Sequence, residues 1–168
     1  MEKTFYLFRH ALSTRSNQGY GDLILTATIL PEETPPIERM GEYLKTLPDG
    51  YNISSDLLRC RQTAEIITKV TGRQFVFDPR LREMVDETFA AVRGRVENIL
   101  AEFNSRPEEH IFVCTHGVVI AAIKRFLLNG DFVENDQNDY PLCGELVIIQ
   151  GKNVNYLDFN QIPPTARS

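Results

Sequence analysis

Two histidines at the ends of two short apolar runs have residue types and neighbours suited to nucleophilic or acid–base chemistry. The run 4–8 leads directly to Arg9 and His10, and the run 111–114 lies just before His116. A neutral imidazole can attack an electrophile, and a protonated one can donate hydrogen bonds. The planar guanidinium of Arg9 can bind two oxygens of a phosphate at once. The pattern therefore predicts a phosphate site in which one histidine is the nucleophile.

Both apolar runs have the composition of strands that are buried on both faces. In an open α/β sheet, ligands bind just beyond the carboxyl ends of parallel strands. If the two strands are parallel neighbours, His10 and His116 meet at that edge of the sheet. Residues 11–22, which follow the first strand, are polar and contain glycine, so they are predicted to form a loop that wraps a ligand.

A further cation is predicted at the same edge. Residues 51–54 are predicted to form a short strand, and a helix capped by Ser55 or Asp56 follows and ends at Gly72. Arg59 lies in the first turn of this helix, where the helix dipole favours acidic residues and disfavours a cation by about a few tenths of a kcal/mol. That local misfit is typical of a residue that binds an anion.

The remaining pattern alternates strands and helices. Further helices are predicted over 37–47, 89–104 and 117–128, with a strand at 75–77 and a hairpin formed by 145–149 and 153–159. Amide groups at the helix start at Gly117 would add positive dipole beside His116. The alternation predicts a three-layer α/β/α sandwich with a mostly parallel central sheet. The 168 residues are expected to form one domain over 1–168, with a flexible tail from 161.

Composition narrows the class of protein and of partner. The chain is 42% hydrophobic and 24% charged, and its net charge of −5 disfavours a nucleic acid or an anionic membrane as partner. Three cysteines without a C-x-x-C motif fit a reducing compartment, and Cys114 in mid-strand is predicted to be structural. No apolar stretch has the length of a signal or membrane segment, so a cytoplasmic protein is expected.

Four blocks of the chain resemble the signature of the histidine phosphatase superfamily, the phosphoglycerate mutase-like clan. Segment 8–13 resembles the first block, 54–65 the second, 81–83 the acid block and 113–117 the last. An Arg-His pair alone would be a weak signal, but here the order and approximate spacing of all four blocks agree. The resemblance implies a phosphoglycerate mutase-like fold.

The resemblance also implies a role for each matched residue. His10 would be phosphorylated, and Arg9, Arg59 and His116 would bind the phosphoryl group. Glu83 would protonate the leaving group and later activate water. No metal ion and no organic cofactor is implied. From its place after the third strand alone, the acid could equally be Asp86 or Glu87.

The departures from the family pattern matter for the activity. Ala11 replaces the usual glycine, and Leu12 stands where mutases and sugar bisphosphatases carry a glutamate. The asparagine of their next loop falls on Ser16, with Asn17 one residue later, and both are candidates for substrate binding. The segment after Glu83 is too short for the large cap insertion of the mutases. The chain therefore resembles the small, compact phosphatases of the clan, including those that act on protein phosphohistidine.

The expected function is that of a metal-independent phosphatase, hydrolysing a phosphomonoester or phosphoramidate through a phosphohistidine on His10. Its partner would be a small phosphorylated metabolite or a phosphohistidine protein; the leaving group and the oligomeric state stay open. One alternative, motivated by Ala11 and Leu12, is a weakly active or inactive module that binds a phospho-ligand or partner. Another is a metal-dependent hydrolase using His10, His116 and either Glu83 or Asp86, although no compact ligand motif is present.

Overall fold

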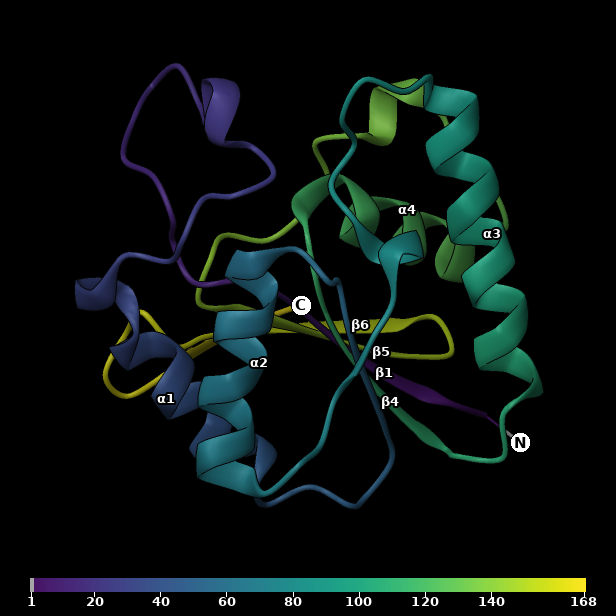
Figure 1. The fold of residues 1–168 in the computed structure, drawn as a ribbon. Helices are drawn as coiled ribbons and strands as arrows, with labels where there is room; N and C mark the ends of the chain where they lie inside the picture. Colours follow the sequence, from purple (N-terminus) through teal and green to yellow (C-terminus); the bar gives the residue numbers. More distant parts are fainter. Residues whose placement is uncertain (1) are drawn as a thin grey trace.

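The computed structural model describes residues 2–168 and places a seven-stranded sheet between two pairs of helices (Figure 1). Across the sheet, the strand order is β3-β2-β4-β1-β5-β6-β7. The strands are β1 Thr4–Arg9, β2 Tyr51–Ser54, β3 Val76–Phe77, β4 His110–Thr115, β5 Glu145–Gln150, β6 Asn153–Asp158 and β7 Thr165–Arg167. The helices are α1 Pro35–Leu44, α2 Leu58–Thr71, α3 Phe89–Ser105 and α4 Gly117–Asn129. This arrangement confirms the predicted α/β/α sandwich.

The half of the sheet that carries the two histidines is parallel. Strands β3, β2, β4 and β1 pair in parallel, and Arg9 at the end of β1 lies opposite Thr115 at the end of β4. The predicted hairpin is present as β5 and β6, with β5 antiparallel to β1. Because the ends of β1 and β4 are in register, the residues that follow them start from the same edge.

The central strands are buried on both faces, as their composition predicts. Successive side chains of a strand point to opposite faces, so Phe5 and Leu7 pack with α3 and α4, whereas Tyr6 and Phe8 pack with α1 and α2. Leu7 and Phe8 are fully buried. Close packing of this kind makes the strand a rigid support for the residues at its end.

The start of α2 differs from the prediction. The helix begins at Leu58, and its N-cap residue, Leu57, makes no side-chain cap. Ser55 Oγ accepts from the amide of Leu57, just before the helix, and also bonds to His116 Nε2, whereas Asp56 accepts two hydrogen bonds from Arg82, so neither residue is the N-cap. The other end is as predicted, since Gly72 adopts the left-handed conformation.

The predicted flexible tail is instead partly a strand. Residues 165–167 form β7, which pairs antiparallel with β6. Arg167 adds two side-chain contacts, one to the Glu145 carboxylate at 3.3 Å and one over the Tyr156 ring at 3.8 Å. Without β7, the edge of β6 would present unpaired backbone groups. The composition of the tail does not predict this pairing, because the partner strand lies elsewhere in the chain. Within residues 2–168, no helix combines the length and apolar character needed to cross a membrane.

Candidate active site

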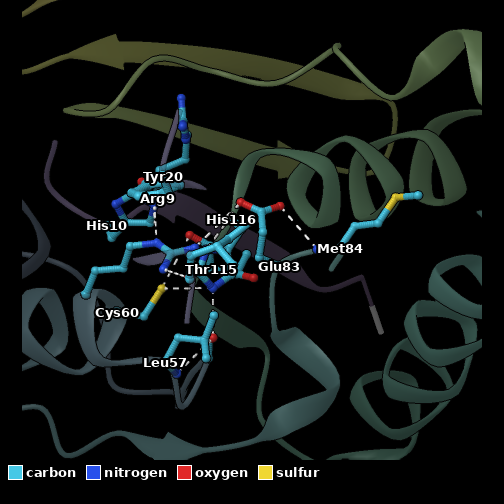
Figure 2. A network of polar contacts seen from close by, with 12 residues as sticks. Arg9, His10, Tyr20, Leu57, Cys60, Glu83, Met84, Thr115 and His116 are labelled. Carbon is cyan, nitrogen blue, oxygen red and sulfur yellow. Dashed lines mark hydrogen bonds and ion pairs between the residues drawn. The ribbon is translucent and has the colours of Figure 1, made fainter. Parts of the chain in front are cut away.

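The two histidines meet at the carboxyl edge of the parallel strands, as their positions predict. His10 directly follows β1, and His116 is the N-cap residue of α4. Their ring centroids are 5.4 Å apart, and both side chains are almost completely buried. Figure 2 shows the rings beside Arg9 and Glu83, with Tyr20 above them.

The imidazole of His10 is held in one orientation. Its Nδ1 lies 2.7 Å from the carbonyl oxygen of Ala11, so Nδ1 carries the proton and donates it to that bond. The other nitrogen, Nε2, lies 3.3 Å from Nε of Arg59, which donates to it. Burial, with the nearby charges of Arg9 and Arg59, lowers the pKa of His10 to about 3. At neutral pH the ring is therefore uncharged, with its lone pair on Nε2.

Arg59 is fully buried and is fixed from three sides. Its Nη1 donates to the carbonyl oxygen of Ile24 at 2.5 Å, and its guanidinium lies under the Tyr20 ring, 4.4 Å from the ring centroid. Its Nη2 has no hydrogen-bond partner among the described residues and lies 3.9 Å from Oε2 of Glu83. The first turn of α2 thus directs a preset cation, with one free donor group, at the edge that His10 faces.

Three buried nitrogens at this edge lack a hydrogen-bond partner within residues 2–168: Arg9 Nε, Arg59 Nη2 and His116 Nδ1. Arg9 is held by a 3.3 Å bond from its Nη1 to the carbonyl oxygen of Pro141. Buried donors are normally satisfied, so a group of unpaired ones indicates a ligand rich in acceptor oxygens. A phosphoryl group has three such oxygens and the complementary charge.

Gly117, the first residue of α4, permits a close approach of Tyr140. A Cβ atom at this position would lie 2.6 Å from the Tyr140 ring, so any other residue would displace that ring. The same ring stacks on Arg9, whose guanidinium carbon lies 5.0 Å from its centroid. Glycine at the helix start therefore supports the position of Arg9 as well as exposing backbone amide groups.

Of the three candidate acids, only Glu83 reaches the site. Its Oε1 accepts a hydrogen bond from the amide of Met84, and its Oε2 lies 3.7 Å from His116 Nδ1. Burial raises the pKa of Glu83 although the charge of Arg59 opposes this shift. Asp86 is exposed, and Glu87 is paired with Arg95 at 2.6 Å. A carboxyl group with a raised pKa next to the donors is suited to general acid catalysis.

The structure does not bring Ser16 and Asn17 to the site. Both are exposed in a turn, where Ser16 accepts hydrogen bonds from the amides of Gly19 and Gln18. Their contact with a substrate therefore stays a prediction, and the residue of this loop that packs against the buried site is Tyr20, on Arg59.

Sequence reasoning missed two hydroxyl residues beside the site, Ser13 and Thr63, and offered Tyr20 only as a residue at the entrance whose place it could not give. The Tyr20 hydroxyl bonds to Ser13, and Thr63 Oγ1 accepts from the amide of Ala11 at 2.9 Å. Gly19 and Gly21, on either side of Tyr20, both have positive φ, at 74° and 55°. An aromatic residue between two glycines in a predicted ligand loop is a signal that could have identified it.

Burial of the histidines makes a prediction about stability. Unfolded histidine binds a proton below about pH 6.5, whereas folded His10 and His116 stay neutral to much lower pH. The unfolded state thus binds more protons between about pH 6.5 and 3, so the free energy of unfolding falls as the pH is lowered. We expect His10→Asn to reduce this loss between pH 7 and 5 by about 1–2 kcal/mol, measured by urea denaturation. If the free energy of unfolding depended on pH in the same way in the variant and the wild type, the assignment of His10 as a buried, neutral histidine would be contradicted.

Among residues 2–168, no group of three or more histidine, cysteine, aspartate or glutamate side chains is placed to hold a metal ion. The metal-dependent alternative therefore finds no ligand set at this edge. The nitrogens that converge there belong to two arginines and two histidines, a set suited to an anion.

Comparison with known proteins agrees with the site. The chain is 40% identical over 83 residues to a Citrobacter koseri protein whose name reads “Probable phosphoglycerate mutase GpmB”. The match covers 47% of this chain and 37% of that relative, so it spans little more than a third of the relative's length.

Solved structures share the fold over most of the chain. The alpha-ribazole phosphatase from Shigella flexneri gives a TM-score of 0.75 at 17% identity, covering 90% of this chain and 93% of that one. A phosphoglycerate mutase from Bacillus anthracis gives 0.70 at 12% identity, covering 91% and 90%. These identities establish the fold alone.

The family itself is given by a model described as histidine phosphatase superfamily (branch 1), which matches residues 5–85 and 85–153. The matched residues include the ends of both central strands, the start of α2 and Glu83. The chain therefore belongs to branch 1 of the histidine phosphatase superfamily.

Proposed function

We propose that the protein is a phosphatase that transfers a phosphoryl group from a phosphomonoester to His10 and then to water. One observation supports this most directly: the neutral Nε2 of His10 lies against Arg59, whose free Nη2 lies 3.9 Å from the Glu83 carboxylate. Nucleophile, anion-binding donor and acid thus lie within one small, buried space. Phosphoryl transfer needs little beyond positioning and stabilisation of charge, which these groups supply.

In the first step, His10 Nε2 attacks phosphorus while the bond to the ester oxygen breaks. The three phosphoryl oxygens are held by Arg9, Arg59 and His116. The proton of Glu83 passes to the departing oxygen, so that an alcohol leaves. The raised pKa of Glu83 increases the fraction of protonated acid at neutral pH.

In the second step, water attacks the phosphorus of the phosphohistidine. The Glu83 carboxylate, which lost its proton in the first step, takes one from that water, and the bond between phosphorus and Nε2 breaks. Inorganic phosphate leaves, and both residues return to their starting protonation states. No metal ion or cofactor takes part in either step of the proposed reaction.

Hydrolysis is proposed rather than a mutase reaction because the chain lacks two features of the mutases, the long insertion after the acid and the glutamate after the histidine. Only residues 84–88 separate Glu83 from α3, and Leu12 is half-buried beside Arg9 in place of a glutamate. With nothing inserted over Glu83, water can reach the phosphohistidine. We also propose that the protein acts in the cytoplasm.

A test follows from the two roles of Glu83. The wild type is expected to hydrolyse 4-nitrophenyl phosphate at a constant rate. Glu83→Gln is expected to release about one equivalent of 4-nitrophenolate rapidly, because this leaving group needs no proton. Its steady rate should then fall about 10²-fold or more, since water lacks its base. Rapid-mixing absorbance measurements report both phases.

The matched control is Glu97→Gln, which removes an exposed carboxylate on α3 that pairs with Arg93. It should behave as the wild type. A wild type that hydrolyses no aryl phosphate would contradict the proposed function. A Glu83→Gln variant with the full steady rate would exclude Glu83 as acid and base.

A further inference from the structure

A hollow of about 450 Å³ opens beside Glu83. We propose that it receives the leaving group, and that it selects phosphomonoesters of uncharged or amine-bearing alcohols over those with a second anionic group. The inference rests on the proposed function and adds the substrate class. A volume of this size lies within the range of small-molecule sites.

The position of the acid decides where the leaving group lies. The departing oxygen must come within hydrogen-bond reach of Glu83, and Glu83 lines both this hollow and the space beside Arg59 and His116. A second hollow of about 190 Å³ lies beside Arg9 and Leu12, and Glu83 does not line it. Glu33, the one carboxyl residue in that lining, is paired with Arg15, so a leaving group placed there would find no free acid, and the hollow at Glu83 is the one that fits the chemistry.

Both cations that line the hollow are already paired. Arg82 donates to the two carboxylate oxygens of Asp56 at 2.6 and 2.8 Å. Arg95 donates to Glu87 at 2.6 Å and to the carbonyl oxygen of Arg80 at 2.7 Å. The positive charge of each guanidinium is thus already offset by a carboxylate, so neither offers an uncompensated charge to a carboxylate or a second phosphate of a substrate.

One carboxylate in the lining is in surplus. Asp86 is exposed at the rim and makes no ion pair within the part of the chain that the structure describes. It would repel an anionic leaving group and attract an ammonium group. The hollow therefore disfavours a negatively charged leaving group, whereas the phosphate pocket favours a negatively charged group.

The other walls are apolar. Leu25 contributes an isobutyl side chain that is half exposed, and Pro79 and Val85 complete this part of the lining. Apolar walls favour a leaving group with a flat or aliphatic face, because its burial removes apolar surface from water. The expected substrate is thus the phosphate ester of a compact alcohol that has such a face and no acid group.

Three aryl phosphates that differ only at the far end of the ring test this inference. They are 4-ethylphenyl phosphate, 4-(2-aminoethyl)phenyl phosphate and 4-(2-carboxyethyl)phenyl phosphate, which have similar leaving oxygens. We expect kcat/KM for the carboxylate to be about tenfold lower than for the ethyl compound, and that for the amine to be equal or higher.

The charge of the lining is tested by Asp86→Asn with Glu87→Gln, two residues outside the catalytic groups. Asparagine tolerates the φ of 50° at position 86. This variant should raise kcat/KM for the carboxylate about fivefold relative to the ethyl compound. The control, Glu97→Gln with Asp131→Asn, changes net charge equally at residues that do not line this hollow, and should leave the ratio unchanged.

The outcomes separate the inference from the function beneath it. Equal kcat/KM for the three esters, or equal effects of the two double variants, would overturn the leaving-group site and leave the phosphatase in place. Failure of all three esters, together with no burst from Glu83→Gln, would overturn both.

Discussion

Replacing His10 by alanine is expected to lower kcat for 4-nitrophenyl phosphate by about 10⁴-fold or more, because the nucleophile is lost. The remaining donors can still bind phosphate, so KM should change much less than kcat. Steady-state kinetics give both constants. Calorimetry with inorganic phosphate should detect binding to the variant, which separates loss of chemistry from loss of the site.

The chain offers a matched control in His110, which starts β4 at the opposite edge of the sheet. Its Nδ1 bonds to the Tyr6 hydroxyl at 3.2 Å, far from the carboxyl ends of the strands. His110→Ala should therefore keep its activity within about twofold, since only a partly buried hydrogen bond is lost. If His10→Ala retained one tenth of the wild-type rate, His10 could not be the nucleophile.

Replacing Arg59 by lysine is expected to lower kcat/KM by about 10³-fold, although the charge is conserved. The guanidinium uses Nε for His10, Nη1 for Ile24 and Nη2 for the ligand. The ammonium group of lysine is a single nitrogen, so it cannot donate at the three positions that the planar guanidinium occupies. Kinetics with 4-nitrophenyl phosphate, and calorimetry with inorganic phosphate, should show loss in both catalysis and binding.

Arg61→Lys is the control for this substitution, since it makes the same change two residues later on α2. Arg61 lies over the Phe77 ring and donates to the carbonyl oxygen of Asp56, away from the histidines. The activity of the Arg61→Lys variant should stay near that of the wild type. Equal effects of the two substitutions would mean that the loss reflects the stability of α2 rather than phosphate binding.

The sequence predicted the parts of the site that regular structure positions. Arg9 and His10 follow a buried parallel strand, and His116 follows its neighbour, so topology alone brings them together. Arg59 was predicted from its place in a helix turn, and that helix starts within two residues of the expected position. In each case local pattern and sheet geometry decide the result, with no need to know distant contacts.

The missed features depend on contacts between distant parts of the chain. Tyr20 stacks on Arg59, 39 positions away, and nothing within the loop's own sequence specifies that partner. Ser16 and Asn17 point outward for the same reason, because the loop's orientation follows the residues that it covers. Ser55 bonds to His116 rather than only capping its own helix. Composition identifies such residues as polar loop residues and leaves their direction open.

The contacts around Arg59 have a thermodynamic consequence for ligand affinity. An arginine side chain has about 2 kcal/mol of rotamer entropy to lose when it is fixed. The Tyr20 ring and the Ile24 carbonyl fix this one before any phosphate arrives, so binding does not bear that cost. By linkage, a ligand that favours the fixed guanidinium must also stabilise the loop that holds it. The order of the loop and the affinity for phosphate are therefore thermodynamically coupled.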